Sequence, residues 1–344
     1  MANIIMPKPW DGKRITPIDE STYYNRRQLI KQLGLAAGGL LVGPYVLSAC
    51  NNAGNNASTA SSLQGEGGSP VQTDITFNFE GMDKLYPAQR NEKYVLDRPM
   101  TKEYDATHYN NFYEFISPTD RNIYNVYKYI GDFDTRDWQF EVAGHVKNKG
   151  TYYLEEIIKK LGIEERTYRF RCVERWSMAV PWTGFPLAAL IKLLEPTNKA
   201  KYVRMQTAEV PKQMPGIKHQ SWYPWPYFEG LRMDEAMNEL AFIATGIYGK
   251  PLPRQNGAPM RLVVPWKYGY KNIKSIVRIE FLNYEPETFW HKIAPHEYPF
   301  ISNIDPDVPH PRWSQKIERL IPDGEPRPTL KYNGYGEYVA KLYE

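Results

Sequence analysis

Residues 168–187 read YRFRCVERWSMAVPWTGFPL and include Cys172, one of two cysteines in a chain of 344 residues. Aromatic and β-branched side chains predict a strand over 166–173, with Cys172 near its end. We expect residues 174–186 to form the loop that follows. Ends of strands that lead into loops are common positions for functional residues. A lone cysteine in an apolar strand is also commonly a small buried hydrophobe, and the strand alone does not separate the two roles.

A second polar segment favours a functional role for this thiol. Residues 253–276 read PRQNGAPMRLVVPWKYGYKNIKSI, which is typical of an anion-binding surface. The side chains expected to form it are Asn256, Arg261, Lys267, Lys271 and Lys274. A solvated charged face is the alternative interpretation of the lysines. Because no histidine stands near Cys172 in the sequence, a thiolate ligand of a transition metal fits better than a Cys–His nucleophile.

The first 50 residues predict a twin-arginine signal peptide. Arg26 and Arg27 precede a moderately apolar, glycine-containing run over 33–47. An amphipathic helix with an arginine pair is the alternative. The run ends in LSAC, residues 47–50, which is similar to a lipoprotein box that would leave Cys50 as an acylated N-terminus; ordinary cleavage is the other possibility. Residues 51–75 are rich in Ser, Asn and Gly and predict a disordered linker.

Charge and composition exclude several functional classes. Six of the 43 basic and three of the 39 acidic residues fall within residues 1–50, so the rest of the chain is close to neutral. We therefore expect no nucleic-acid partner. The six histidines show no zinc-type spacing, and the cysteines form neither a haem CxxCH motif nor an iron–sulfur set. If Cys50 is acylated or removed, Cys172 has no partner for an internal disulfide.

The body, residues 76–344, reads as one domain in which strands predominate. Predicted strands cover 138–144, 166–173, 201–207, 239–249, 260–266 and 274–284. Predicted helices cover 153–162, before a terminating glycine, and 186–195, with proline in the first turn. The proline-rich tail predicts extended chain on the surface. Together these elements indicate an α+β fold.

Four segments closely resemble the periplasmic protein-methionine-sulfoxide reductase catalytic subunits, a family of molybdopterin enzymes with the sulfite-oxidase fold. They are YNNFYEF (109–115), YRFRCVERWSMAVPWTGFPL (168–187), QNGAPMRLVVPWKYGYKNIKSI (255–276) and HPRWSQ (310–315). The resemblance runs from about residue 110 to the C-terminus. It implies a sulfite-oxidase-type molybdopterin-binding fold, with mixed sheets and inserted helices in a single domain.

The resemblance also implies roles for individual residues. Cys172 would be the thiolate ligand of molybdenum in one Mo-molybdopterin per chain. The pterin contacts would be Asn110, Tyr113, Glu114, Thr207, Asn256, Arg261, Asn272, Ile273 and Lys274. Glu174 is our candidate for a catalytic, proton-handling group; a salt bridge to Arg171 or Arg175 is its alternative role.

The implied function is repair of exported proteins, by reduction of their methionine sulfoxide residues in the periplasm. The chain would be a monomeric catalytic subunit in a heterodimer with a membrane haem-b electron-donor subunit fed by quinols. Its other partners would be the oxidised protein substrates and the twin-arginine export machinery. We expect the aromatic stretches 176–182 and 219–230 to form an apolar rim; burial in the core is the alternative. The alternatives are a related enzyme acting on sulfite or on small S- or N-oxides, and a non-catalytic exported binding lipoprotein.

Overall fold

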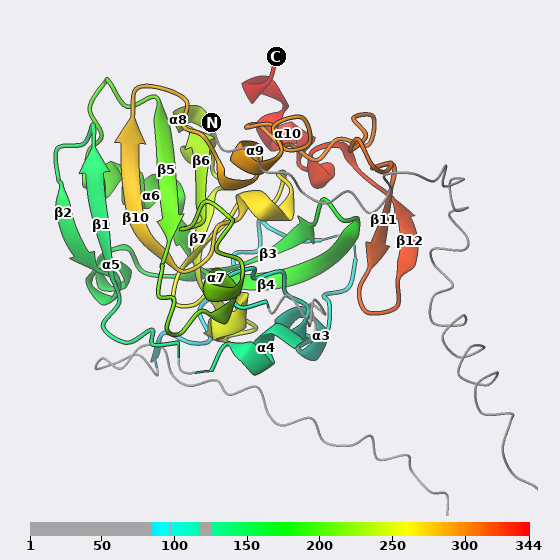
Figure 1. Cartoon of the computed structure of the whole chain (residues 1–344), viewed down its shortest axis with the longest axis horizontal. Coiled ribbons are helices and arrows are strands. Elements are labelled where there is room, and N and C mark those ends of the chain that lie inside the picture. The colour runs from blue at the N-terminus through cyan, green and yellow to red at the C-terminus, as the bar shows by residue number, and fades with distance from the viewer. Residues whose placement is uncertain (1–83, 97, 117–124, 132) are drawn as a thin grey trace, which may run out of the picture. The chain divides into compact units, whose positions relative to one another are not determined.

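Two β-sheets carry the fold of the computed structural model, which describes residues 84–96, 98–116, 125–131 and 133–344 (Figure 1). The five-stranded sheet has the order β2-β1-β10-β5-β6. Its strands are β1 (Gln139–Gly144), β2 (Gly150–Tyr153), β5 (Tyr202–Thr207), β6 (Phe228–Arg232) and β10 (Ile276–Leu282). Strands β1 and β10 run parallel, and the other neighbours are antiparallel. Parallel and antiparallel strand pairs therefore occur within one sheet.

The seven-stranded sheet is arranged around β4. Its strands are β3 (Glu164–Arg171), β4 (Trp176–Pro186), β7 (Phe242–Ile247), β8 (Lys250–Pro251), β9 (Arg261–Val263), β11 (Ile317–Leu320) and β12 (Glu325–Pro328). Strand β4 pairs antiparallel with β3 and β7 and parallel with β11. The mixed sheets, with helices inserted between their strands, confirm the predicted α+β class.

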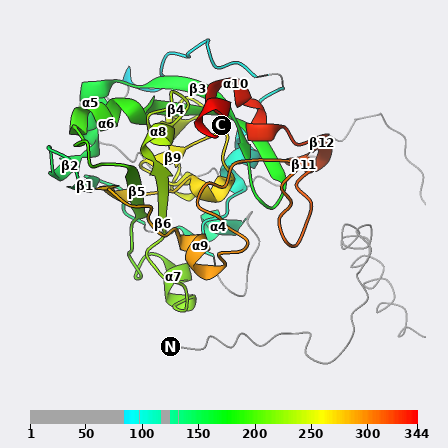
Figure 2. The ribbon, with the colours of Figure 1, turned by 90° about the horizontal axis from the view of Figure 1, so that it is seen from above.

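Short helices cover the sheets and connect their strands. The α-helices are α3 (Glu103–His108), α4 (Val126–Tyr129), α5 (Leu154–Leu161), α6 (Leu187–Leu194), α7 (Pro215–His219), α8 (Met233–Ala236), α9 (Phe289–Ile293) and α10 (Gly336–Val339). The 3-10 turns are η3 (Arg254–Asn256), η4 (Gly269–Lys271), η5 (Lys331–Gly334) and η6 (Ala340–Leu342). Helices α5 and α6, both predicted, lie side by side (Figure 2).

Residues 174–186 do not form the expected loop. A short turn follows β3, and residues 176–186 then form β4, an eleven-residue strand that is buried except at its end. The loop interpretation was wrong because Pro181 and Gly184 interrupt a pattern that otherwise suits a strand. Gly184 sits at a register shift against β7, where a Cβ atom would lie 2.0 Å from the carbonyl oxygen of Ile243. Only glycine permits this close approach of the two strands.

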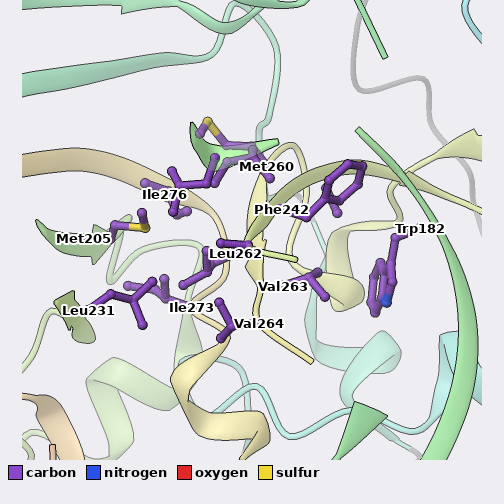
Figure 3. Close-up of a cluster of buried hydrophobic side chains, with 14 of the residues drawn as sticks. Trp182, Met205, Leu231, Phe242, Met260, Leu262, Val263, Val264, Ile273 and Ile276 are labelled. Carbon is purple, nitrogen blue, oxygen red and sulfur yellow. The ribbon is translucent and has the colours of Figure 1, made fainter. Parts of the chain in front are cut away.

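The main hydrophobic core joins the two sheets. Met205, Leu231 and Ile276 come from β5, β6 and β10, whereas Trp182 and Phe242 come from β4 and β7. Figure 3 shows these two groups on either side of the β9 segment around Leu262. All of these side chains are buried. This shared core fixes the ends of β3, β5 and β9 relative to one another, and these ends carry the site.

The proline-rich tail departs from the expected extended chain. Strands β11 and β12 form an antiparallel hairpin, and β11 also extends the large sheet through β4. Trp313, in the segment before this hairpin, stacks on His310 with ring centroids 3.9 Å apart. Residues 317–320 and 325–328 are therefore a hairpin at the edge of the sheet, with β12 mostly exposed, whereas residues 306–313 lie outside its strands.

The predicted signal peptide, its lipobox-like end and the linker, residues 1–50 and 51–75, lie outside the described residues. The described residues belong to one compact unit, Gly68–Glu344. Within the part of the chain that the structure describes, no helix is both long and apolar enough to span a bilayer.

Candidate active site

One cleft gathers side chains from segments far apart in the sequence. It leaves about 900 Å³ free of protein atoms, including the open solvent at its mouth. Its lining includes Cys172, Glu174 and all of the residues that the resemblance implies as pterin contacts: Asn110, Tyr113, Glu114, Thr207, Asn256, Arg261, Asn272, Ile273 and Lys274. The structure therefore places these residues around one space.

Cys172 lies in the turn between β3 and β4. The turn is closed by backbone hydrogen bonds from Cys172 N to the carbonyl of Trp176 and from Arg175 N to the carbonyl of Cys172, both 2.9 Å long. The residue is 6% exposed, and its thiol faces the cleft. Burial, and then the negative charge of Glu174, raise the pKa of this thiol well above its usual value. Binding of a metal cation would displace that proton and stabilise the thiolate.

Glu174 is exposed at the mouth of the cleft and held in place by neutral donors. Asn111 Nδ2 donates to Glu174 Oε2 at 2.9 Å, and Trp176 Nε1 donates to the same oxygen at 3.2 Å. That oxygen lies 3.9 Å from the Cys172 sulfur. Arg171 is not its partner: its guanidinium lies in the interior, 3.5 Å from Glu318.

Behind Cys172, a buried network fixes the backbone of the turn. Trp313 Nε1 and Gln315 Nε2 both donate to the carbonyl oxygen of Val173, at 2.9 and 2.8 Å. Gln315 Oε1 accepts a 2.8 Å hydrogen bond from Arg171, which also donates to the carbonyl of Cys172. The carbonyl of Val173 is thus held directly by Trp313 and Gln315, in the segment that follows residue 310. The carbonyl of Cys172 is held by Arg171, which itself donates to Gln315.

Two cations line the cleft, and of these Arg261 is buried and Lys274 is half-buried. Arg261 donates to the backbone carbonyls of Asn256 and Asn272, at 2.9 and 3.1 Å, and Lys274 donates to that of Asn111 at 2.7 Å. Among the described residues, no carboxylate lies within ion-pair distance of either cation. Burial lowers the pKa of Arg261 to about 9. Burial, and then the charge of Arg261, lower that of Lys274.

The amides near these cations leave an acceptor unused. Asn256 Nδ2 donates to the carbonyl of Ala106 at 3.1 Å and to Asn110 Oδ1 at 3.3 Å, whereas Asn256 Oδ1 is buried without a hydrogen-bond partner. Thr207 Oγ1 donates to the carbonyl of Lys274 at 2.8 Å. A buried cation without a counterion and a buried acceptor without a hydrogen bond both cost folding free energy. A bound anion with hydrogen-bonding groups would pair with the cations and satisfy the acceptor.

The comparisons with known proteins agree with this chemistry. A family model described as the oxidoreductase molybdopterin binding domain matches residues 127–290. The protein-methionine-sulfoxide reductase catalytic subunit MsrP of Pseudomonas syringae pv. tomato is 51% identical over 76% of this chain and 78% of its own length. The MsrP of Burkholderia mallei is 44% identical over 96% of this chain and 91% of its own. This chain belongs to the protein-methionine-sulfoxide reductase catalytic subunit family.

A solved structure shows a weaker likeness. The sulfane dehydrogenase SoxCD of Paracoccus pantotrophus aligns at 14% identity with a TM-score of 0.40. The alignment covers 77% of this chain and 62% of that one.

The cleft of this reductase family member fits a molybdopterin. The cofactor carries a phosphate, which suits Arg261 and Lys274, and a hydrogen-bonding pterin, which suits the free Asn256 oxygen. No group of three His, Cys, Asp or Glu side chains with metal-site geometry occurs in the described part of the chain.

Two of the expected anion-binding lysines do not reach the cleft. Lys267 is buried in an ion pair with Glu235 at 2.6 Å, and Lys271 in one with Glu229 at 2.5 Å. Both the cleft prediction and the solvated-face alternative were wrong for these two residues. Lys274 differs because it follows η4, at the end that leads back to β10 beside Thr207.

Sequence reasoning missed several residues of the cleft. Asn111 was quoted only as part of a motif, although it contacts both Glu174 and, at 3.9 Å, the Cys172 sulfur. Trp290 and Tyr298 line the mouth from α9 and the segment after it. No spacing in the sequence links α9 to Cys172, because 118 residues separate Trp290 from it.

Proposed function

We propose that this protein reduces methionine sulfoxide residues in exported proteins back to methionine, as a repair enzyme of the bacterial envelope. The observation that carries the proposal is the buried thiol of Cys172 in a cleft that also holds Arg261 and Lys274, neither in ion-pair contact with a described carboxylate, in a chain of this reductase family. Both features are what a molybdopterin held through one cysteine requires.

The protein's own residues have separate tasks in this scheme. Cys172 would hold the metal, and Arg261, Lys274, Asn110, Asn256 and Thr207 would hold the pterin and its phosphate. When bound, the molybdenum group supplies two-electron chemistry and acceptance of the sulfoxide oxygen. The Glu174 carboxylate, oriented by Asn111 and Trp176, is the protein group best placed to pass protons at the mouth of the cleft.

The charges at the mouth favour a neutral sulfoxide over sulfite. The positive groups, Arg261 and Lys274, lie at the inner wall, where the cofactor would neutralise them. The exposed carboxylate of Glu174 stands 3.9 Å from the thiol that would bind the metal. An anionic substrate approaching this point would be repelled by the carboxylate, whereas a neutral sulfoxide would not.

We further propose that the chain works in the periplasm, exported by the twin-arginine machinery and tethered through Cys50 if that residue is acylated. The chain would carry one Mo-molybdopterin and no other redox group, because its two cysteines provide neither a c-type haem motif nor an iron–sulfur set. Electrons would therefore come from a second protein, a membrane haem-b subunit that draws on quinols.

Cys172→Ser tests the assignment with two readouts. We expect the variant to fold, to lose bound molybdenum and to lose reduction of an oxidised protein substrate. The wild-type protein should contain about one molybdenum per chain. Retained activity with molybdenum bound would overturn the ligand assignment. Wild-type turnover of sulfite in place of methionine sulfoxide would overturn the substrate.

A further inference from the structure

A second hollow lies on the surface beside the cleft. Aromatic and prolyl side chains form most of its walls: Pro224, Trp225, Phe228, Tyr284 and Pro286. Tyr284 is 59% exposed, although it is a large ring in a groove of other rings. A rigid aromatic and prolyl groove of this kind suits an extended peptide with apolar or prolyl side chains. We call it the aromatic groove.

The aromatic groove and the cleft share one wall, formed by the start of β6 and by α9, which lie next to each other in both views (Figures 1 and 2). Tyr227 lines the cleft, and the next residue, Phe228, lines the groove. On α9, Trp290 faces the cleft, and Lys292 borders the groove. The two hollows are therefore separated by the thickness of one helix and one strand end.

Ring contacts connect the mouth of the cleft to the groove. Tyr113 and Trp290, both in the lining of the cleft, lie 5.0 Å apart between centroids. Tyr223 lies 6.0 Å from Trp290 and 5.8 Å from Trp225, which lines the groove. Trp222, 58% exposed, lies 5.9 Å from Tyr223. Aromatic surface thus runs without a break from the cleft to the groove.

The charged side chains at the groove are already paired. Arg204 lies 2.9 Å from Glu280, and Lys292 lies 3.6 Å from Glu287. The groove residues therefore offer no unpaired charge to attract a charged segment, and an uncharged segment is the complementary partner.

We propose that the aromatic groove binds the polypeptide that flanks the oxidised methionine of a protein substrate, with apolar or prolyl residues seated in it. This inference rests on the proposed function. Because the thiol of Cys172 is buried within the cleft, only the sulfoxide side chain enters, and the substrate backbone stays at the mouth. An extended chain covers roughly 3.3–3.6 Å per residue, so a few residues reach across α9. The groove determines which residues are preferred next to the methionine sulfoxide of the substrate, and the reduction itself takes place in the cleft.

The test compares a short substrate with a long one in the holoenzyme. The short substrate is N-acetyl-methionine sulfoxide amide. The long one is a peptide of about twelve residues in which methionine sulfoxide is flanked by Ala, Leu and Pro, roughly 40 Å when extended. The variant is Trp222→Ala/Tyr284→Ala, which removes two exposed rings outside the cleft lining. Tyr153→Ala on β2, where Tyr153 is 45% exposed, is the matched control.

We expect kcat/KM for the long peptide to fall about five- to thirtyfold in the double variant, as for interface aromatic residues, while the short substrate is unaffected. The control should change neither value. Equal losses on both substrates, or no loss on the peptide, would overturn the proposal. So would a change in the oligomeric state of the double variant without peptide, since the groove would then bind a second copy of the chain.

Peptide binding, followed by tryptophan fluorescence without turnover, separates this inference from the proposed function. If the wild-type protein reduces neither substrate, the proposed function fails. The groove inference then stands only if the double variant binds the peptide five- to thirtyfold more weakly than the control, and equal affinities overturn it.

Discussion

Asn111 and Glu174, 63 residues apart in the sequence, are joined by a 2.9 Å hydrogen bond at the mouth of the cleft. The Asn111 amide also lies 3.9 Å from the Cys172 sulfur. A residue from the segment after α3 and one from the β3–β4 turn therefore set the surroundings of the thiol together. The two groups that donate to the carboxylate, Asn111 and Trp176, are neutral, so these hydrogen bonds do not neutralise its negative charge.

This arrangement predicts that Glu174→Gln lowers kcat for sulfoxide reduction by about 100-fold, the usual contribution of a positioned acid or base. The substitution keeps the shape of the side chain but removes its ability to carry a proton. Molybdenum content should be unchanged. Steady-state kinetics measure the effect, and Glu209→Gln, at an exposed glutamate outside the cleft lining, serves as the control. Unchanged kcat would leave Glu174 with a structural role only.

Arg261→Leu should weaken the cofactor-loaded protein more than the cofactor-free protein. Without cofactor, the guanidinium has no carboxylate in ion-pair contact among the described residues, so its removal loses only its hydrogen bonds to the carbonyls of Asn256 and Asn272, a cost of about 1–3 kcal/mol. With cofactor, the lost phosphate contact should reduce retained molybdopterin. Thermal unfolding of both forms and cofactor content are the measurements.

Arg166→Leu is the matched control for that comparison. Arg166 is also buried, but it is paired with Glu164 at 2.5 Å and lies over Tyr94. Its removal should destabilise both forms alike. If Arg261→Leu behaved in the same way, the interpretation of Arg261 as an anion-binding residue would be wrong.

Lys274 predicts a pH dependence of the cofactor-free protein. Burial and the charge of Arg261 lower its pKa below the ordinary 10.5. Between the lowered pKa and 10.5 the unfolded chain holds more protons than the folded one, so this residue makes stability rise with pH. The rise amounts to at most about 1.4 kcal/mol per pH unit. Lys274→Met should lack this increment when unfolding free energies are compared between about pH 8 and 10; parallel curves for the two proteins would contradict the prediction.

The sequence predicted the elements whose patterns are local. Strands β1, β3, β5, β7, β9 and β10 and helices α5 and α6 all fall within or close to their predicted ranges. Helix α5, for example, has an apolar face formed by Leu154, Ile157 and Ile158 and ends at Gly162, whose φ is +69°. These signals depend on neighbours within one or two turns, so a sequence contains them in full.

Strand β4 and the buried lysines were mispredicted because their surroundings are distant in sequence. Gly184 fits the strand only because the register against β7 shifts beside it, and Pro181 lies opposite Thr167 of β3. Lys267 and Lys271 are buried only because Glu235 and Glu229, more than thirty residues away, lie beside them in the fold. The resemblance located the cleft residues through motifs, but no motif contained the contact of Asn111 with Glu174 or the approach of Trp290.

The buried pair of Lys267 and Glu235 gives the last prediction. Their side chains are 2.6 Å apart and fully buried, and Glu235 also accepts a 2.7 Å hydrogen bond from Tyr343 near the C-terminus. Lys267→Met leaves the carboxylate without its cation and should cost about 3–5 kcal/mol of unfolding free energy.

The double variant Lys267→Met/Glu235→Leu shows whether the buried ion pair adds to the free energy of unfolding or contributes no more than two apolar side chains would. Removing both charges should recover most of the loss, because apolar side chains of similar volume replace a buried ion pair at little cost. Denaturant unfolding of both single variants and the double variant provides the cycle, and Lys147→Met, which breaks the exposed pair with Glu195, is the control. An exposed pair is worth at most about 1 kcal/mol. If the double variant were as unstable as the sum of the singles, the pair would not be coupled, and the anchoring of the C-terminus through Tyr343 would account for the loss.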